Sequence, residues 1–159
     1  MNAPFPTGVE DDSVDLGALT GSVGFMLRMA QVAVYDQFFR EFANTDVRPG
    51  EFSVLWVIAM NPDLRQGTLA RTLNIKPAHM TKLVQRLVRE GLVKRIVPPE
   101  DRRSVRLALT DKGRIHLNRH RSTFLHVHDA ERIGLTDAET TQLLGLLQKL
   151  AFKDTSSCR

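Results

Sequence analysis

The chain has little cysteine and no long apolar run. Its only cysteine, Cys158, lies in the polar C-terminal end, so an intrachain disulfide is impossible and a cysteine-based metal cluster is not indicated. The longest nearly unbroken apolar segment, Phe52 to Met60, is far shorter than the roughly 18–20 residues that span a bilayer. The N-terminus also lacks the basic start and apolar stretch of a signal peptide. We therefore expect a protein without a membrane partner that works in the reducing cytoplasm.

The sequence also lacks the motifs that mark most enzymes. It has no nucleophile motif, no phosphate-binding glycine loop and no cluster of metal ligands, so we expect no catalytic activity, no cofactor and no metal. A chain of 159 residues, 42% of them hydrophobic, can bury one core and is too short for two independent ones. The patterns described next predict an α+β fold, mostly α with a small β-hairpin.

Positive charge is concentrated in the middle of the chain. Between Lys76 and Arg106 there are nine basic and three acidic side chains, an excess of six, which exceeds the net charge of +4 of the whole chain. Residues 1–15 carry four acidic side chains among proline and glycine and are predicted to form a flexible arm. Such a local basic excess is typical of nucleic-acid binding, whereas evenly spread charge would indicate only solubility.

Long apolar helices are expected at both ends of the chain. The spacing predicts one helix over residues 16–43 that is apolar on nearly all sides, and another from Thr110 to about Arg132. A capping box at Thr136 to Glu139 starts a leucine-rich last helix. Helices with so wide an apolar surface need cover on more than one side. Segments 16–43 and 111–152 are therefore predicted to be the dimerisation helices of a homodimer, followed by a tail at 153–159.

Two short helical patterns lie close together near the middle of the chain. Residues 66–73 and 77–90 are joined only by Asn74-Ile75-Lys76, after a helix that begins at Pro49. Asparagine tolerates the left-handed conformation of a sharp helix exit, and Pro77 suits a first helical turn. The pattern predicts a helix-turn-helix whose second helix is apolar on one side and basic on the other.

A basic β-hairpin, or wing, follows directly. Gly91 ends the helix, and strands are predicted over residues 92–97 and 105–109. A helix-turn-helix alone is common in helical proteins. With a basic second helix and a basic hairpin beside it, the unit could engage adjacent grooves of one duplex, which favours double-stranded DNA as the partner.

The residues that carry a family resemblance are those of the wing and the helix-turn-helix. The segment from Asp101 to Gly113, with its Asp-x-Arg and Leu-Thr-x-x-Gly elements, resembles the wing signature of the MarR family of bacterial transcriptional regulators. Asn61-Pro62 and the spacing of leucines from Leu69 to Leu92 also match. The resemblance covers residues 16–152 and implies a winged helix-turn-helix at 49–110, in a triangular dimer that binds a roughly palindromic operator.

The resemblance implies a set of DNA-binding residues. Base edges would be met from the start of the second helix, a phosphate by Arg86 and the minor groove by Arg103, with Asp101 holding the wing. The full predicted set is Lys76, Pro77, Ala78, His79, Thr81, Lys82, Gln85, Arg86, Arg102, Arg103 and Ser104. Three helix starts depart from the family pattern. Arg48, Arg65 and Lys76 stand where a hydroxyl or small polar cap is usual, at a cost of about 1 kcal/mol each.

The same resemblance implies a ligand-controlled regulator, most simply a repressor released from DNA by a small anionic effector. The first-helix pattern is similar to that of regulators of aromatic-acid catabolism, some of which respond to aromatic acyl-CoA thioesters. Arg28 interrupts an apolar helix, so it must reach solvent, a carboxylate of the partner subunit or an anionic ligand. The residues predicted to bind the effector are Phe25, Arg28, Met29, Trp56, His116 and His120.

Two alternatives stay open on the sequence alone. An architectural DNA-binding protein would keep this fold without an effector, and its apolar candidates would be ordinary core residues. A zinc-responsive regulator would use His116 and His120, whose four-residue spacing on a helix can chelate zinc, but no third ligand is evident.

Overall fold

The computed structural model describes residues 14–99 and 104–152, and it is mostly α-helical with one small sheet, as predicted. The predicted tail at 153–159, with Cys158, and nearly all of the predicted arm lie outside the described residues. The elements in chain order are η1 (Gly17–Gly21), α1 (Val23–Glu41), α2 (Pro49–Met60), β1 (Leu64–Arg65), α3 (Gln66–Thr72), α4 (Pro77–Arg89), β2 (Val93–Ile96), β3 (Arg106–Leu109), α5 (Asp111–His126), α6 (Ala130–Ile133) and α7 (Asp137–Ala151).

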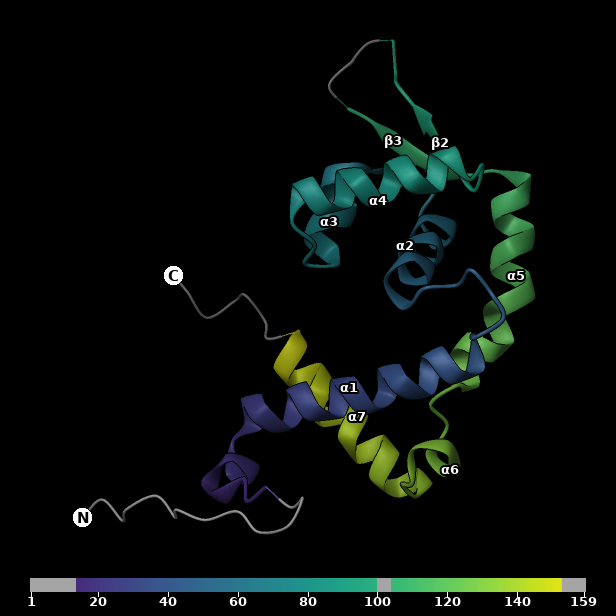
Figure 1. Cartoon of the computed structure of the whole chain (residues 1–159). Helices are drawn as coiled ribbons and strands as arrows, with labels where there is room; N and C mark the ends of the chain where they lie inside the picture. Colours follow the sequence, from purple (N-terminus) through teal and green to yellow (C-terminus); the bar gives the residue numbers. More distant parts are fainter. Residues whose placement is uncertain (1–13, 100–103, 153–159) are drawn as a thin grey trace, which may run out of the picture.

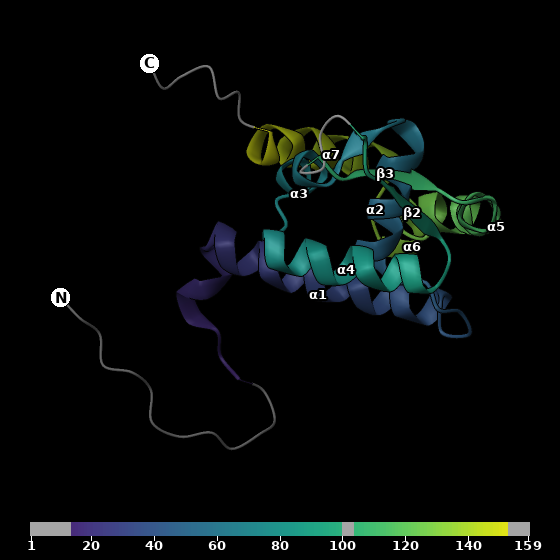
Figure 2. The same ribbon diagram turned by 90° about the horizontal axis from the view of Figure 1, so that it is seen from above.

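Two groups of elements are joined by α5. In Figure 1, α2, α3, α4 and the sheet form an upper lobe, while α1, α6 and α7 lie below it, and α5 descends from one group to the other. Seen from above, α1 and α7 lie on opposite sides of the molecule (Figure 2). None of the helices formed by the described residues is long and apolar enough to cross a lipid bilayer.

The core lies in the upper lobe and extends down to α1. Phe52, Val54 and Leu55 of α2 are fully buried, and they belong to one apolar cluster with Leu69 of α3 and Leu107 of β3. The sheet has the antiparallel order β1-β3-β2. The two-residue strand β1 was not predicted, because a strand so short shows no alternation.

The prediction of one helix over residues 16–43 is wrong at its start. A 3₁₀ helix at Gly17–Gly21 comes first, and Ser22 is extended (φ −87°, ψ 118°). The Ser22 hydroxyl accepts a hydrogen bond from the backbone N–H of Phe25 at 3.5 Å, so Ser22 is the N-cap of α1. Serine at this position stabilises a new helix start more than it stabilises helix continuation.

The predicted helix from Thr110 to Arg132 is likewise too long, since α5 ends at His126 and α6 is separate. The carboxylate of Asp129 lies 3.0 Å from Nδ1 of His126, and Nε2 of His128 donates to the carbonyl of Val34 in α1 at 2.7 Å. These contacts anchor the turn against α1. The predicted capping box of α7 is confirmed, with Thr136 and Glu139 bonded reciprocally.

A tight joint connects the sheet to α5. The Thr110 hydroxyl donates to the carbonyl of Gly91 at 2.6 Å and accepts from the backbone N–H of Gly113 at 3.0 Å. The backbone N–H of Thr110 donates to the carbonyl of Leu92 at 3.0 Å. A Cβ atom on Gly113 would stand 2.0 Å from that same carbonyl oxygen, so this position admits only glycine.

We expect Gly113→Ala to destabilise the protein by about 1–3 kcal/mol or more, because the added methyl group forces α5 away from Leu92. Chemical denaturation measures the free energy of unfolding. The matched control is Gly50→Ala in α2, where nothing lies within 4 Å of the added Cβ and alanine should be neutral or mildly stabilising. Equal stability of the two variants would contradict the close approach at Gly113.

Candidate nucleic-acid interface

The turn between α3 and α4 has the geometry of a helix-turn-helix. Asn74 adopts the predicted left-handed conformation (φ 50°), and the backbone N–H of Ile75 donates to the carbonyl of Ala70 at 2.8 Å. Leu69 and Met80 are fully buried between the two helices. The turn is therefore held by both backbone and core contacts, which fixes the direction of α4.

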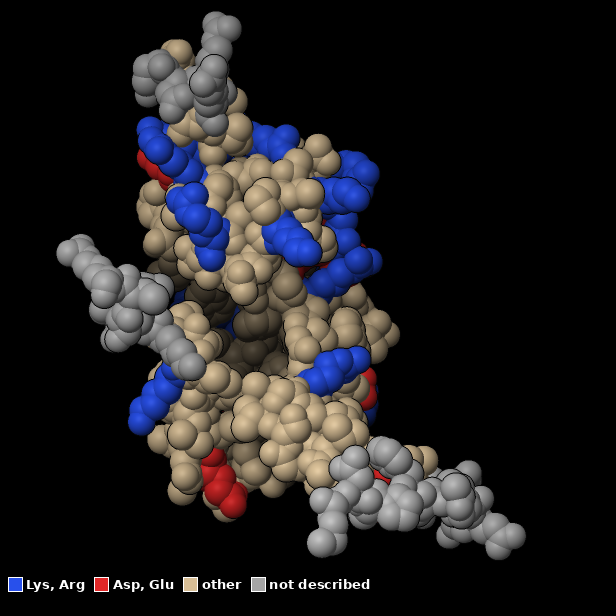
Figure 3. Space-filling model, turned by 90° about the vertical axis from the view of Figure 1, so that its left-hand side faces the viewer, with Lys and Arg blue, Asp and Glu red and all other residues tan. Residues whose placement is uncertain are grey.

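α4 separates its apolar and polar residues cleanly. Met80, Leu83, Val84 and Leu87 are buried. Most of the predicted DNA-contacting residues of this helix are exposed on the other side: Lys76, Pro77, Ala78, His79, Lys82 and Gln85. Figure 3 shows lysine and arginine side chains gathered over the upper lobe, with few carboxylates beside them.

Thr81 differs from its exposed neighbours. Its side chain is half-buried, its hydroxyl donates to the carbonyl of Pro77 at 2.9 Å, and it accepts from Nε2 of Gln66 in α3 at 3.3 Å. The single hydroxyl hydrogen is thus used within α4. A base contact from Thr81 would therefore come through its methyl group or its remaining lone pair.

Arg86 is engaged by carboxylates. Its guanidinium forms an ion pair with Glu51 of α2, and its Nε lies 3.3 Å from Oε1 of Glu90. The side chains of Arg86 and Glu51 are 25% and 14% exposed. The interaction connects α4 to α2 at one end of a mixed polar and apolar pocket of about 620 Å³. Arg86 is thus engaged by two carboxylates of the protein, and the phosphate contact implied for it stays a prediction.

The wing is present, but its tip is not described. β2 and β3 pair antiparallel with Val93 opposite Leu109 and Ile96 opposite Arg106. Arg102 and Arg103, together with Asp101, lie outside the described residues. Ser104 is 8% exposed, so its hydroxyl faces the protein interior and not a DNA surface.

Sequence reasoning recognised a basic hairpin but assigned no DNA contact to the basic residues of the strands themselves. Arg65, Lys94, Arg95 and Arg106 all come from the three strands. The helical spacing that identified the exposed side of α4 gives no information on these positions. Strand alternation could have placed Lys94, Arg95 and Arg106, whose strands were predicted, whereas Arg65 lies on β1, which was not.

The predicted effector-binding residues fall into two groups. Trp56 of α2 is half-buried, and Cζ of Arg121 in α5 lies 5.1 Å from its ring centroid, a cation–π contact that was not predicted. His116 and His120 lie on the same helix as Arg121, with ring centroids 5.0 Å apart. Phe25, Arg28 and Met29 lie on the first half of α1, where Arg28 and Met29 are exposed.

The two histidines are favoured in their neutral form. Burial and the neighbouring His120 lower the pKa of His116 below the ordinary value of 6.5, and burial and Arg119 lower the pKa of His120. Among residues 14–99 and 104–152, no group of three or more His, Cys, Asp or Glu side chains could hold a metal ion.

The comparisons with known proteins identify this architecture. The model of the MarR family matches residues 47–105, the segment that holds the helix-turn-helix and most of the wing. A relative from Thauera aromatica, a candidate transcriptional regulatory protein for the hcr operon, is 35% identical over 142 residues, which are 89% of this chain and 86% of the relative. The chain belongs to the MarR family.

Solved structures of the transcriptional repressor CouR resemble this MarR-family chain over most of their length. CouR bound to a 23-mer DNA duplex superposes with a TM-score of 0.79 at 32% identity, covering 88% of this chain and 99% of CouR. CouR bound to p-coumaroyl-CoA gives a TM-score of 0.77 at 29% identity, covering 87% and 98%.

Membership of the MarR family settles the class of the protein. The family consists of transcriptional regulators and not of enzymes, so this chain is a DNA-binding transcriptional regulator with a winged helix-turn-helix. Which of its side chains contact DNA stays a prediction.

The ion pair of Arg86 makes a prediction about α4. We expect Arg86→Gln to lower the free energy of unfolding by about 1–3 kcal/mol, because Glu51 is left half-buried without its charged partner. Chemical denaturation of Arg86→Gln, Glu51→Gln and the double variant should show a coupling energy between the two positions. If Arg86→Gln keeps the wild-type stability but its DNA affinity becomes less salt-dependent by about one phosphate contact per subunit, the phosphate role is favoured instead.

Proposed function

We propose that this MarR-family regulator is a homodimer that represses transcription by occupying a palindromic operator and leaves it on binding a small anionic effector. The observation that supports DNA occupation most directly is the exposed side of α4, basic at Lys76 and Lys82, with a wing beside it. In this arrangement α4 would enter the major groove and Arg103 the adjacent minor groove.

Apolar surface on α1 and α7 supports the dimer. Met26, Met29 and Phe39 of α1 and Leu144 and Leu146 of α7 are about half exposed, each between 46% and 56%. A cavity of about 880 Å³, lined largely by apolar side chains, also separates α7 from Val34 of α1. Large apolar side chains exposed in such numbers on two helices are often covered by a partner, and helices of a second copy would cover these surfaces.

The surroundings of Trp56 support the effector. Figure 3 shows a hollow between the upper lobe and the lower helices. Trp56 offers an aromatic surface, and Arg121 above it offers a cation for a ligand's negative group. CouR, which shares this fold, has been solved with p-coumaroyl-CoA. An aromatic acid or its acyl-CoA thioester therefore fits the chemistry of Trp56 and Arg121, with His116 and His120 as neutral hydrogen-bonding groups.

Arg28 is our second candidate to hold the effector's negative group, with Phe25 and Met29 as apolar neighbours. Among the described residues no carboxylate lies within ion-pairing distance of Arg28. Our proposal gives it a ligand as partner, with solvent and a carboxylate of the second subunit as the alternatives. Binding would favour a spacing of the two α4 helices that no longer fits the grooves, and a coupling free energy of about 1–3 kcal/mol is enough for release.

Dimeric binding predicts the geometry of the operator. We expect two inverted half-sites whose centres lie about one helical turn, 10–10.5 bp, apart, because a twofold dimer presents two like α4 helices. Footprinting on duplexes obtained by in vitro selection measures this. A duplex with only one half-site is the control and should bind far more weakly. Equal affinity for the single half-site, with one subunit bound, would overturn the dimeric proposal.

Arg28 makes a prediction about effector binding. We expect Arg28→Gln to weaken binding of 4-coumarate or p-coumaroyl-CoA by about 10- to 100-fold, because a charge-assisted hydrogen bond is lost. Calorimetry measures the affinity, and Arg40→Gln, an exposed arginine of the same helix bonded to Gln37, is the matched control. Unchanged effector affinity with a weakened dimer would show that Arg28 pairs with a carboxylate of the second subunit.

A further inference from the structure

The outer face of the three-stranded sheet carries positive charges at adjacent positions. Leu107 and Leu109 of β3 are buried, so Arg106 and Ala108, which alternate with them, face the other side of the sheet. Arg65 lies opposite Arg106, and Lys94 lies opposite Ala108. Residues paired in this way share a face, so Arg65, Lys94 and Arg106 lie on one outer face.

This arrangement is unfavourable for the protein on its own. Side chains directly opposite each other in an antiparallel pair have Cβ atoms about 4.5–5.5 Å apart, and like charges there repel. Arg65 and Lys94 are exposed and Arg106 is half-buried. Within residues 14–99 and 104–152, no carboxylate forms an ion pair with any of the three. A polyanion bound across the face would turn this repulsion into attraction.

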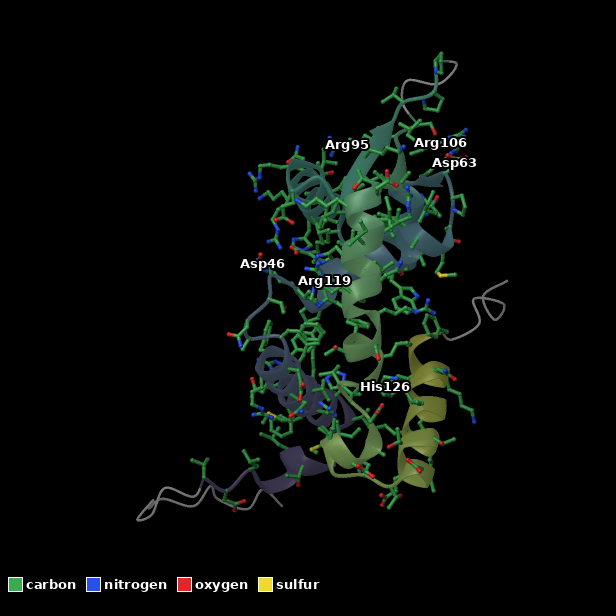
Figure 4. All side chains as sticks on the ribbon, turned by 90° about the vertical axis from the view of Figure 1, so that its right-hand side faces the viewer. Asp46, Asp63, Arg95, Arg106, Arg119 and His126 are labelled. Carbon is green, nitrogen blue, oxygen red and sulfur yellow. The ribbon has the colours of Figure 1, made fainter. Side chains whose placement is uncertain are left out.

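The position of this outer face on the molecule indicates which polyanion would bind to it. The inner face of the sheet packs on α2, and the sheet lies at the top of the upper lobe in Figure 1, on the side where the wing projects. β1 leads directly into α3 and contacts it, so this edge of the sheet adjoins the helix-turn-helix. Figure 4 shows Arg106 beside Asp63 on one side of the lobe and Arg95 on the opposite side, so Arg95 is not part of this face.

We propose that Arg65, Lys94 and Arg106 form a phosphate-binding patch that contacts the DNA backbone outside the segment met by α4. The patch extends the contact with the duplex along its length and adds affinity without sequence preference, since phosphates are the same at every base pair. The inference rests on the DNA-binding mode proposed above. Asp63, next to Arg106 in Figure 4, opposes the patch electrostatically.

The experiment measures how the dissociation constant depends on KCl concentration, for a 30-bp duplex obtained by in vitro selection and for a random duplex of the same length. We expect Arg65→Gln and Arg106→Gln each to reduce the slope of log K against log [KCl] by about 1.8, because each removes one phosphate contact from both subunits of the dimer, and the double variant by about twice that. Both duplexes should lose affinity by the same factor, so the ratio between them stays constant.

Two further variants sharpen the test. Arg119→Gln removes a charge from α5, below the upper lobe in Figure 4, and should leave the slope unchanged. Asp63→Asn should tighten binding of both duplexes, because it removes a negative charge beside the patch. Asp63 has φ 57°, a conformation that asparagine tolerates, so this variant should fold normally. The arginine variants should melt at or above the wild-type temperature, since they relieve repulsion.

Shortening the selected duplex from both ends gives an independent measurement. Once the outer phosphates are removed, the wild type and the double variant should bind with equal affinity. Wild-type slopes in both arginine variants would overturn the patch, as would a loss confined to the selected duplex, which would mean base recognition. Salt-independent or absent binding by the wild type itself would instead contradict the DNA-binding mode, so the two failures are distinguishable.

Discussion

The close contact between Gly113 and the carbonyl of Leu92 is the constraint on which the rest of the arrangement depends. Thr110 completes the joint by bonding to both Gly91 and the start of α5. The Lys112 ammonium also donates to the carbonyl of Glu90 at the end of α4, at 2.7 Å. The last turn of α4 and the first turn of α5 therefore form one rigid corner, and a shift of α5 is passed directly to α4.

This corner explains how a ligand site and a DNA site far apart in the chain can be coupled. Arg121 and Trp56 lie on α5 and α2, and α2 is connected to α4 by the ion pair between Glu51 and Arg86. A ligand that changes the position of α5 against α2 would thus act on α4 through two contacts near its C-terminal end. Energetic coupling of this kind needs contiguous packed elements with two arrangements, and α2, α4 and α5 are contiguous.

Local chemistry determined which elements the sequence could predict. The turn at Asn74, the start of α4 at Pro77 and the cap at Thr136 depend on residues within a few positions of each other, and all three are confirmed. The start of α1 was placed too early because apolar spacing continues through Ser22, although the serine caps a new helix. The end of α5 depends on His128 bonding to Val34 in a distant helix, which no local pattern reveals.

In the candidate site, too, local patterns predicted some features, while others depend on contacts between distant parts of the chain. Helical spacing correctly identified the exposed side of α4 but could not show that Arg86 is engaged by Glu51 of α2. Likewise, the pairing of Arg65 with Arg106 depends on strand register across separate parts of the chain. Sequence periodicity gives the direction of a side chain relative to its own element. Which charge it meets there is decided by tertiary structure.

The contact between Arg121 and Trp56 has a practical consequence, because Trp56 is the only tryptophan in the chain. Its emission reports on a single environment, with a guanidinium held over the indole. Any molecule that displaces Arg121 from the ring, or that shifts α5 against α2, changes the local field at this one fluorophore. The fluorescence of Trp56 can therefore report, without any label, on changes at the junction between the two groups of helices.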